Sequence, residues 1–423
     1  MSSVNLAKGL AEASMSSLTF TADAETTEVS SPLRLPLRRV LAIDAFRGLT
    51  ILVMIFVNTL EDVQGMPAWL YHAPDDADFM TFPDLVFPAF LFIVGMSIPF
   101  AAAQRLAVGD TIWQLVRHAV ARTAGLLVLG VFMVNAEAGY DEAAMPMSIG
   151  LWSLLFYASA FMVWGVVRFQ NKALTMALRI AGAASLVALA SLFRGGEDGS
   201  APLSPQWWGI LGLIGWAYLF ASLFYLMGRG RVPPLIAAIL LLLIYYCVAQ
   251  WDAVQSSPIL QMLAGQSENA VHTAIVLSGV MTALFFFNAS RDSTPRRFGS
   301  ALALSVALAA IGVLLEPYYG VSKVTATPSW GLYSAALCVA AFTLLYWLID
   351  LKGARGWTAF LSPAAANPLF IYMLPNIIAA LMKCLGFNLP APLTHGATGF
   401  AWAAAYALFM LALAHRMRLR LRL

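Results

Sequence analysis

A histidine beside carboxylates is the clearest candidate for chemistry in this sequence. His72 lies in a polar, acidic loop between two long apolar segments, and Asp84 opens the second of them. A neutral imidazole can accept a proton from an amine or a hydroxyl, and a nearby carboxylate fixes its tautomer and raises its basicity. The pair therefore predicts a general base. The alternative is a solvated loop histidine among ordinary surface acids.

The first apolar segment carries three more polar side chains. Asp44 and Arg47 are three residues apart and so share one helix face. Asn58 follows about 21 Å further along the helix from Asp44, at a rise of 1.5 Å per residue. Polar groups at membrane depth are costly, so they usually serve a site or pair with one another. Asp44 and Arg47 predict either an ion pair or a contact with a cytosolic ligand's phosphate, and Asn58 either caps the helix or orients a substrate carbonyl.

Two later segments add candidate binding residues. Lys323 stands in a loop, and Ser329 follows it where a hydroxyl could hydrogen-bond a sugar or provide the N-cap of the next helix. Asn367 precedes Pro368, which is typical of an N-cap followed by a proline at the first helical position. We therefore count Lys323, Ser329 and Asn367 as candidate substrate contacts, with helix capping as the alternative for the last two.

The composition indicates a polytopic membrane protein. The chain has 423 residues, of which 60% are hydrophobic and only 11% are charged, and its mean hydropathy is +0.76. A soluble domain carries about 25% charged residues. There is no basic block with interleaved aromatic residues, so nucleic acid is not expected as a partner. The spacing of the three cysteines fits neither a metal site nor a disulfide framework.

Apolar runs long enough to cross a bilayer predict an all-α bundle of about twelve transmembrane helices, with ten as the lower alternative. We expect this domain to cover residues 39–415, preceded by a disordered cytoplasmic tail at 1–38 and followed by a basic cytoplasmic tail at 416–423. The predicted spans are residues 41–60, 84–104, 113–135, 148–167, 173–193, 208–228, 232–250, 269–288, 298–316, 331–350, 366–387 and 397–415.

The basic residues predict the orientation of the bundle. With the N-terminus inside, all 25 Lys and Arg residues fall on the cytoplasmic side except Arg194, Lys323 and Lys383. Both termini are therefore expected in the cytoplasm, and His72 is expected in the first outer loop. No short apolar core with a small-residue cleavage site precedes Arg34, so a cleaved secretory signal is not expected.

Four segments resemble the transmembrane acetyltransferase family of heparan-α-glucosaminide N-acetyltransferase, in particular its uncharacterised bacterial branch. The first two are RVLAIDAFRGLTILVMIFVN (39–58) and YHA (71–73) followed by FPDLVFPAFLFIVGMSI (82–98). The others are SKVTATPSWGLY (322–333) and NPLFIYMLP (367–375). They stand in the family's order, and the first two are specific only in combination.

The resemblance implies a helical bundle that moves an acetyl group from cytosolic acetyl-CoA to the amine of a terminal glucosamine on the far side. Its active histidine matches His72, its D-L-V-F-P aspartate matches Asp84, and the asparagine closing its first helix matches Asn58. This chain departs from the family at residues 74–82, PDDADFMTF, where the animal enzyme has a Trp-Asn-Gly-like run. The loop that faces the acceptor is therefore different.

These observations favour an acetyltransferase of the bacterial inner membrane. We expect acetyl-CoA as the donor, with no metal, and an amino sugar or glycan as the acceptor. His72, oriented by Asp84, would deprotonate the acceptor amine for direct transfer rather than carry the acetyl group, and Asn58 would hold the thioester carbonyl. The alternatives are a transporter or flippase of a small polar or lipid-linked solute, and an O-acetyltransferase of envelope polysaccharide. We expect the lipid bilayer as a partner, and the sequence leaves open whether the protein forms a homodimer.

Overall fold

The computed structural model describes residues 40–166, 171–196, 198–288, 293–417, 419, 421 and 423. Within these residues the regular structure is helical, and β pairing is limited to isolated bridges. The predicted all-α class is therefore confirmed. The tail predicted for residues 1–38 lies outside the described residues, as do three arginines of the predicted basic tail at 416–423.

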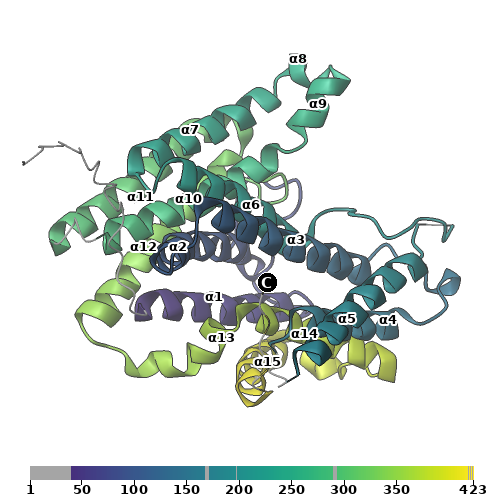
Figure 1. Ribbon diagram of the computed structural model, residues 1–423. Coiled ribbons are helices and arrows are strands. Elements are labelled where there is room, and N and C mark those ends of the chain that lie inside the picture. Colours follow the sequence, from purple (N-terminus) through teal and green to yellow (C-terminus); the bar gives the residue numbers. More distant parts are fainter. Residues whose placement is uncertain are drawn as a thin grey trace, which may run out of the picture. The chain divides into compact units, whose positions relative to one another are not determined.

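In the described ranges, twelve long helices correspond one to one with the predicted spans (Figure 1). They are α1 (Leu41–Leu60), α2 (Val86–Ala107), α3 (Ile112–Glu137), α4 (Ile149–Trp164), α5 (Lys172–Leu192), α6 (Gly209–Met227), α7 (Val232–Ala249), α10 (Ser267–Phe287), α11 (Thr294–Tyr319), α12 (Pro328–Tyr346), α14 (Pro368–Leu385) and α15 (Gly396–Met417).

Eleven helical segments in the described part of the chain are long and apolar enough to span a membrane, which confirms a polytopic bundle. The exception is α4, whose 16 residues rise only about 24 Å, short of the roughly 30 Å hydrocarbon core. It ends at Trp164 because the next residue, Gly165, has an extended backbone. Three short helices are not predicted by the sequence: α8 (Asp252–Gln255), α9 (Pro258–Ala264) and α13 (Ser362–Ala366).

Helix α10 is the most enclosed helix of the bundle. Its apolar window is fully buried, and α2, α6, α7 and α12 pack around it. The contact with α2 depends on two glycines, because a Cβ at Gly95 would lie 1.9 Å from the Val276 carbonyl oxygen and one at Gly279 would lie 2.0 Å from that of Phe92. The two backbones can therefore approach closely only without side chains at these positions.

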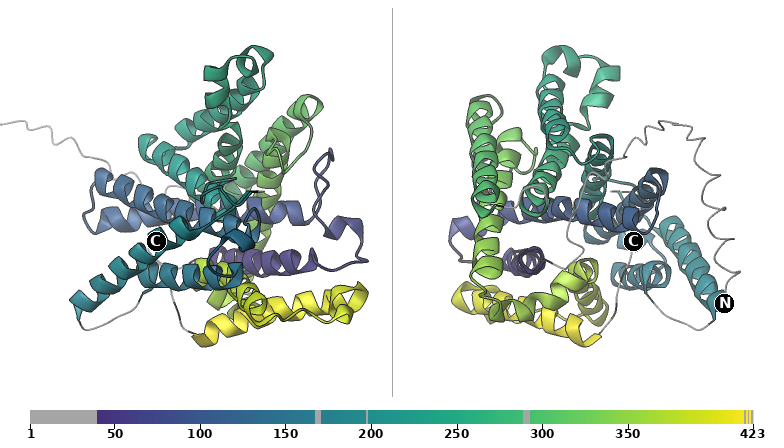
Figure 2. Two further views of the ribbon diagram at one scale, coloured as in Figure 1. Left: turned by 90° about the vertical axis from the view of Figure 1, so that its right-hand side faces the viewer. Right: turned by 60° about the vertical axis from the view of Figure 1, so that its left-hand side comes forward.

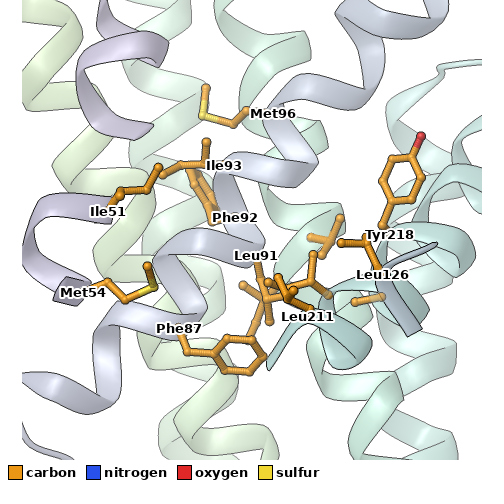
Figure 3. Packing of buried hydrophobic residues seen from close by; sticks show 14 of the residues in the cluster. Ile51, Met54, Phe87, Leu91, Phe92, Ile93, Met96, Leu126, Leu211 and Tyr218 are labelled. Atoms are coloured by element: carbon orange, nitrogen blue, oxygen red, sulfur yellow. The ribbon is translucent and has the colours of Figure 1, made fainter. Parts of the chain in front are cut away.

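Helix α1 joins the first half of the chain to the last. It packs against α2 and α12 and also against α13, α14 and α15, so in both views of Figure 2 it lies between α2 and the C-terminal helices. Figure 3 shows Ile51 and Met54 of α1 facing Phe92 and Ile93 of α2 in the apolar core. The polar residues of α1 are thus held on a helix that packs against both the first and the last helices of the bundle.

Candidate active site

The structure brings the predicted base and its carboxylate together. His72 lies in the loop after a 3-10 turn at Ala68–Leu70, and Asp84 lies in a second turn, Pro83–Leu85, that leads directly into α2. The distance from His72 Nδ1 to Asp84 Oδ1 is 2.6 Å. Because a carboxylate accepts, Nδ1 carries the proton and Nε2 keeps its lone pair. This is the tautomer that a general base requires.

The Asp84 carboxylate is buried, with 2% of its side chain exposed, and is held by the loop around it. Its Oδ2 accepts from the backbone N–H of Thr81 at 2.9 Å and from that of Ala73 at 3.2 Å. The Thr81 hydroxyl lies 2.9 Å from the same oxygen and 2.6 Å from the Tyr71 carbonyl, and its one proton can serve either. Buried carboxylates are tolerated when they are hydrogen-bonded in this way.

Helix α12 and the loop before it complete this cluster. Trp330, which is fully buried, donates its Nε1–H to the Asp84 carbonyl oxygen at 3.2 Å. Lys323 Nζ lies 3.0 Å from Nδ1 and 3.3 Å from Nε2 of His72, and 3.8 Å from Asp84 Oδ1. If Lys323 Nζ lay in the plane of the His72 ring at these distances from both nitrogens, it would collide with Cε1, the carbon between them. The ammonium therefore lies against the face of the imidazole, as in a cation–π contact.

Ser329 is not the N-cap of α12, contrary to one of the two sequence interpretations. The N-cap is Thr327, and Pro328 takes the first helical position, where its missing N–H costs nothing. Ser329 is therefore the second residue of the helix. Its hydroxyl oxygen is buried and without a hydrogen-bond partner among the described residues. Its predicted role in binding stays a prediction.

Asp44 and Arg47 form the predicted ion pair, with Nη1 of Arg47 3.1 Å from Asp44 Oδ1. Arg47 also donates from Nη2 to Ser97 Oγ at 2.8 Å and from Nη1 to the Ala365 carbonyl at 3.4 Å, so it ties α1 to α2 and α13. Arg47 lines a cavity of about 340 Å³, here called the Arg47 cavity. Arg122 lines it too.

Asn367 lies in the wall of the same cavity. It is the N-cap of α14 with Pro368 at the first helical position, as the sequence predicts. Its side chain makes no capping bond, however. Instead Nδ2 donates to the Leu419 carbonyl and Oδ1 accepts from the Leu421 N–H, so Asn367 holds the C-terminal segment against this part of the bundle.

Asn58 lies elsewhere, in a cavity of about 900 Å³ that we call the Asn58 cavity. It does not cap α1, because the C-cap residue is Glu61. No hydrogen bond joins Asn58 to His72 in the described part of the chain. Glu61 acts electrostatically on both Lys323 of the His72 cluster and Glu137 of the Asn58 cavity. The end of α1 therefore lies within electrostatic range of both Lys323 and Glu137.

Several lining residues of the two cavities were not singled out by the sequence. The Asn58 cavity is lined by carboxylates, amides, one lysine and aromatic rings, among them Glu137, Lys383, Tyr140 and Trp402. Lys383 Nζ lies 5.7 Å from the centre of the Tyr140 ring. Arg122 was detectable in principle, because a charge within a membrane span marks a site more often than not. In the described ranges, no three His, Cys, Asp or Glu side chains are close enough to hold a metal ion.

Comparisons with known proteins agree with the resemblance. The family described as "Domain of unknown function (DUF5009)" matches residues 39–257, just over half of the chain. Heparan-alpha-glucosaminide N-acetyltransferase of Mus musculus is 34% identical over 113 residues, and that of Homo sapiens is 29% identical over 113 residues. Each match covers 26% of this chain and 16% of the relative, so the chain spans about a sixth of these curated relatives. The chain therefore belongs to the family of this domain of unknown function, and part of it is similar to these N-acetyltransferases.

Proposed function

We propose that this protein is a multi-pass membrane acetyltransferase that moves an acetyl group from acetyl-CoA to the amine of a glucosamine-like amino sugar. The observation that carries the proposal is the 2.6 Å contact between His72 Nδ1 and the buried Asp84 carboxylate, which leaves Nε2 as a proton acceptor. The similarity to two N-acetyltransferases supports the class of reaction. We place the protein in the bacterial inner membrane, with its basic loops in the cytoplasm.

The Arg47 cavity suits the donor. Arg47 and Arg122 present guanidinium groups, which match the oxygens of phosphates, and the rest of the wall is largely apolar, with Phe90, Ile93 and Val94. An anionic head group with an uncharged arm, as in acetyl-CoA, would meet both kinds of surface. Arg122 also stacks on Tyr218, with its guanidinium carbon 4.8 Å from the ring centre, which fixes its position.

The proposed reaction is a direct transfer. The acceptor amine attacks the thioester carbonyl carbon while His72 Nε2 takes the amine proton. The C–S bond then breaks, the amide forms, and the leaving thiolate of CoA takes the proton back from the imidazolium. Asp84 stabilises that imidazolium through Nδ1–H, and Asn58 remains the candidate donor to the thioester oxygen. For both groups to act on one reaction, the acceptor must lie within reach of both His72 Nε2 and Asn58.

A labelled-donor assay tests this proposal. Purified protein in liposomes would receive acetyl-CoA labelled in the acetyl group, with glucosamine or glucose as acceptor. We expect a labelled amide with glucosamine and no labelled product with glucose. An ester of glucose would contradict amine transfer and favour O-acetylation. Absence of any labelled product from folded protein would overturn the acetyltransferase assignment.

Lys323 predicts an alkaline limit to the activity. Burial lowers the pKa of Lys323 below the usual value near 10.4, although the Asp84 and Glu61 carboxylates oppose this change. A lysine is charged below its pKa, so rising pH removes this ammonium from beside Asp84 earlier than from a free lysine. Because Lys323 is a candidate substrate contact, we expect activity to fall as this charge is lost. In Lys323→Arg, the guanidinium stays charged, and the fall should move to higher pH; identical pH profiles would exclude Lys323 as the cause.

A further inference from the structure

Two cavities are lined in part by helix α1, one by its first half and the other by its second half. Arg47 lines the first and Asn58 the second, and their separation of eleven positions in the sequence corresponds to about 16 Å along the helix axis. Helix α14 borders both cavities, with Asn367, Pro368 and Leu369 at its start in the first and Asn376, Lys383 and others further along in the second. The two spaces therefore follow one another along α1 and α14.

A single side chain is common to the two cavities. Among the residues that the structure describes, Tyr372 alone lines both of them. It is half-buried, whereas its neighbours Ile371 and Met373 are fully buried in the core. Tyr372 therefore borders both a basic, partly apolar space and a space lined by carboxylates, amides and aromatic rings.

The backbone next to Tyr372 is weakened at this point. Pro375 lies inside α14 and has no N–H. The carbonyl of Ile371, four residues earlier, therefore receives no helical hydrogen bond from it, and helices commonly bend at such a site. A bend here would move the part of α14 after Pro375, which lines the Asn58 cavity, relative to the start of the helix, which Asn367 holds against the C-terminal segment. Tyr372 thus lies beside a point at which the two parts of the helix can move relative to one another.

We propose that Tyr372 is the barrier between the donor and acceptor spaces, and that the acetyl-bearing end of the donor passes this ring to reach the Asn58 cavity. This deepens the proposed function and rests on it for the identity of the donor. Tyr372 acts here as a positioning residue rather than a catalytic one, because it sets where the thioester can reach. The barrier itself is a property of the fold and is testable without any acetyl transfer.

Cysteine accessibility tests the barrier directly. In a background without the three native cysteines, Tyr372→Cys would be treated in sealed vesicles with a charged, membrane-impermeant thiol reagent added on one side at a time. We expect labelling from both sides. Two control positions, one in the first turn of α14 and one in the loop after it, should each react from one side only, and from opposite sides: Leu369→Cys in the Arg47 cavity and Asn388→Cys in the Asn58 cavity. Labelling of Tyr372→Cys from one side or from neither, with both controls as expected, would overturn the barrier.

A second variant gives a kinetic readout. Tyr372→Trp enlarges the ring without introducing charge, so it should narrow the passage and lower kcat at least tenfold while the KM for acetyl-CoA stays near wild type. A purely structural role would instead reduce the yield of folded protein and leave kcat per folded molecule unchanged. Unchanged kcat would overturn the passage. Because labelling needs no catalysis, a protein that is labelled as expected but transfers no acetyl group would refute the proposed function and not the barrier.

Discussion

Replacing His72 with alanine is expected to reduce acetyl transfer by roughly 10²- to 10⁴-fold, the range that a general acid–base group contributes. The loss should appear in kcat, because Nε2 takes the amine proton during the chemical step. The fold should survive, since His72 lies in a loop with 28% of its side chain exposed and most of the cluster's hydrogen bonds go to Asp84. Initial rates with labelled acetyl-CoA in liposomes measure the effect.

A second loop histidine provides the matched control. His395 is exposed, and among the described residues its ring hydrogen-bonds only with Thr394 and with the Ala391 carbonyl of its own loop. His395→Ala should therefore retain wild-type kcat. A His72→Ala protein that transfers acetyl groups at the wild-type rate, with normal yield and melting temperature, would refute the assignment of the base.

Changing Asp84 to asparagine is expected to cost nearly as much activity as losing His72. The amide would offer an N–H to Nδ1 and so favour the imidazole tautomer with its proton on Nε2, where no base remains. The volume is conserved, and the amide oxygen can still accept from the backbone N–H groups of Thr81 and Ala73. The protein should therefore fold, and kcat should fall by roughly 10²-fold or more.

The double variant His72→Ala/Asp84→Asn tests whether Asp84 acts only by positioning His72 or also has a role of its own. If Asp84 acts only through His72, Asp84→Asn should lower kcat no further in the His72→Ala background. Additive losses would show that Asp84 acts on the substrate directly. Asp76→Asn is the control, because Asp76 is an exposed acid of the same loop, and it should leave kcat unchanged.

The helices were predictable because hydropathy depends on local sequence alone. All twelve predicted spans are helices, with ends that mostly agree within a few residues. The errors occur where local rules are weak. Residues 252–255 and 258–264 are too short for a periodic pattern, and α4 ends early because Gly165 is extended.

The site was predictable only in part. His72 and Asp84 are twelve residues apart, and the second opens a helix, so their contact follows from a short loop. Lys323 is 251 residues from His72, and no local pattern predicts that the two meet. The cap at Ser329 was misplaced because Pro328 competes for the first helical position. The cavities depend on how distant helices pack, which the sequence pattern does not specify.

The distance along the chain between His72 and Lys323 also affects the order in which the site can form during synthesis. The loop of residues 72–84 leaves the ribosome early, but Lys323 and Trp330 follow only after nine of the twelve long helices have been made. Until then, Asp84 lacks the Trp330 hydrogen bond and His72 lacks the lysine against its ring. A nascent chain anchored in the membrane by its first helices would therefore carry an incomplete site. The reactive arrangement would appear only when the bundle is nearly whole.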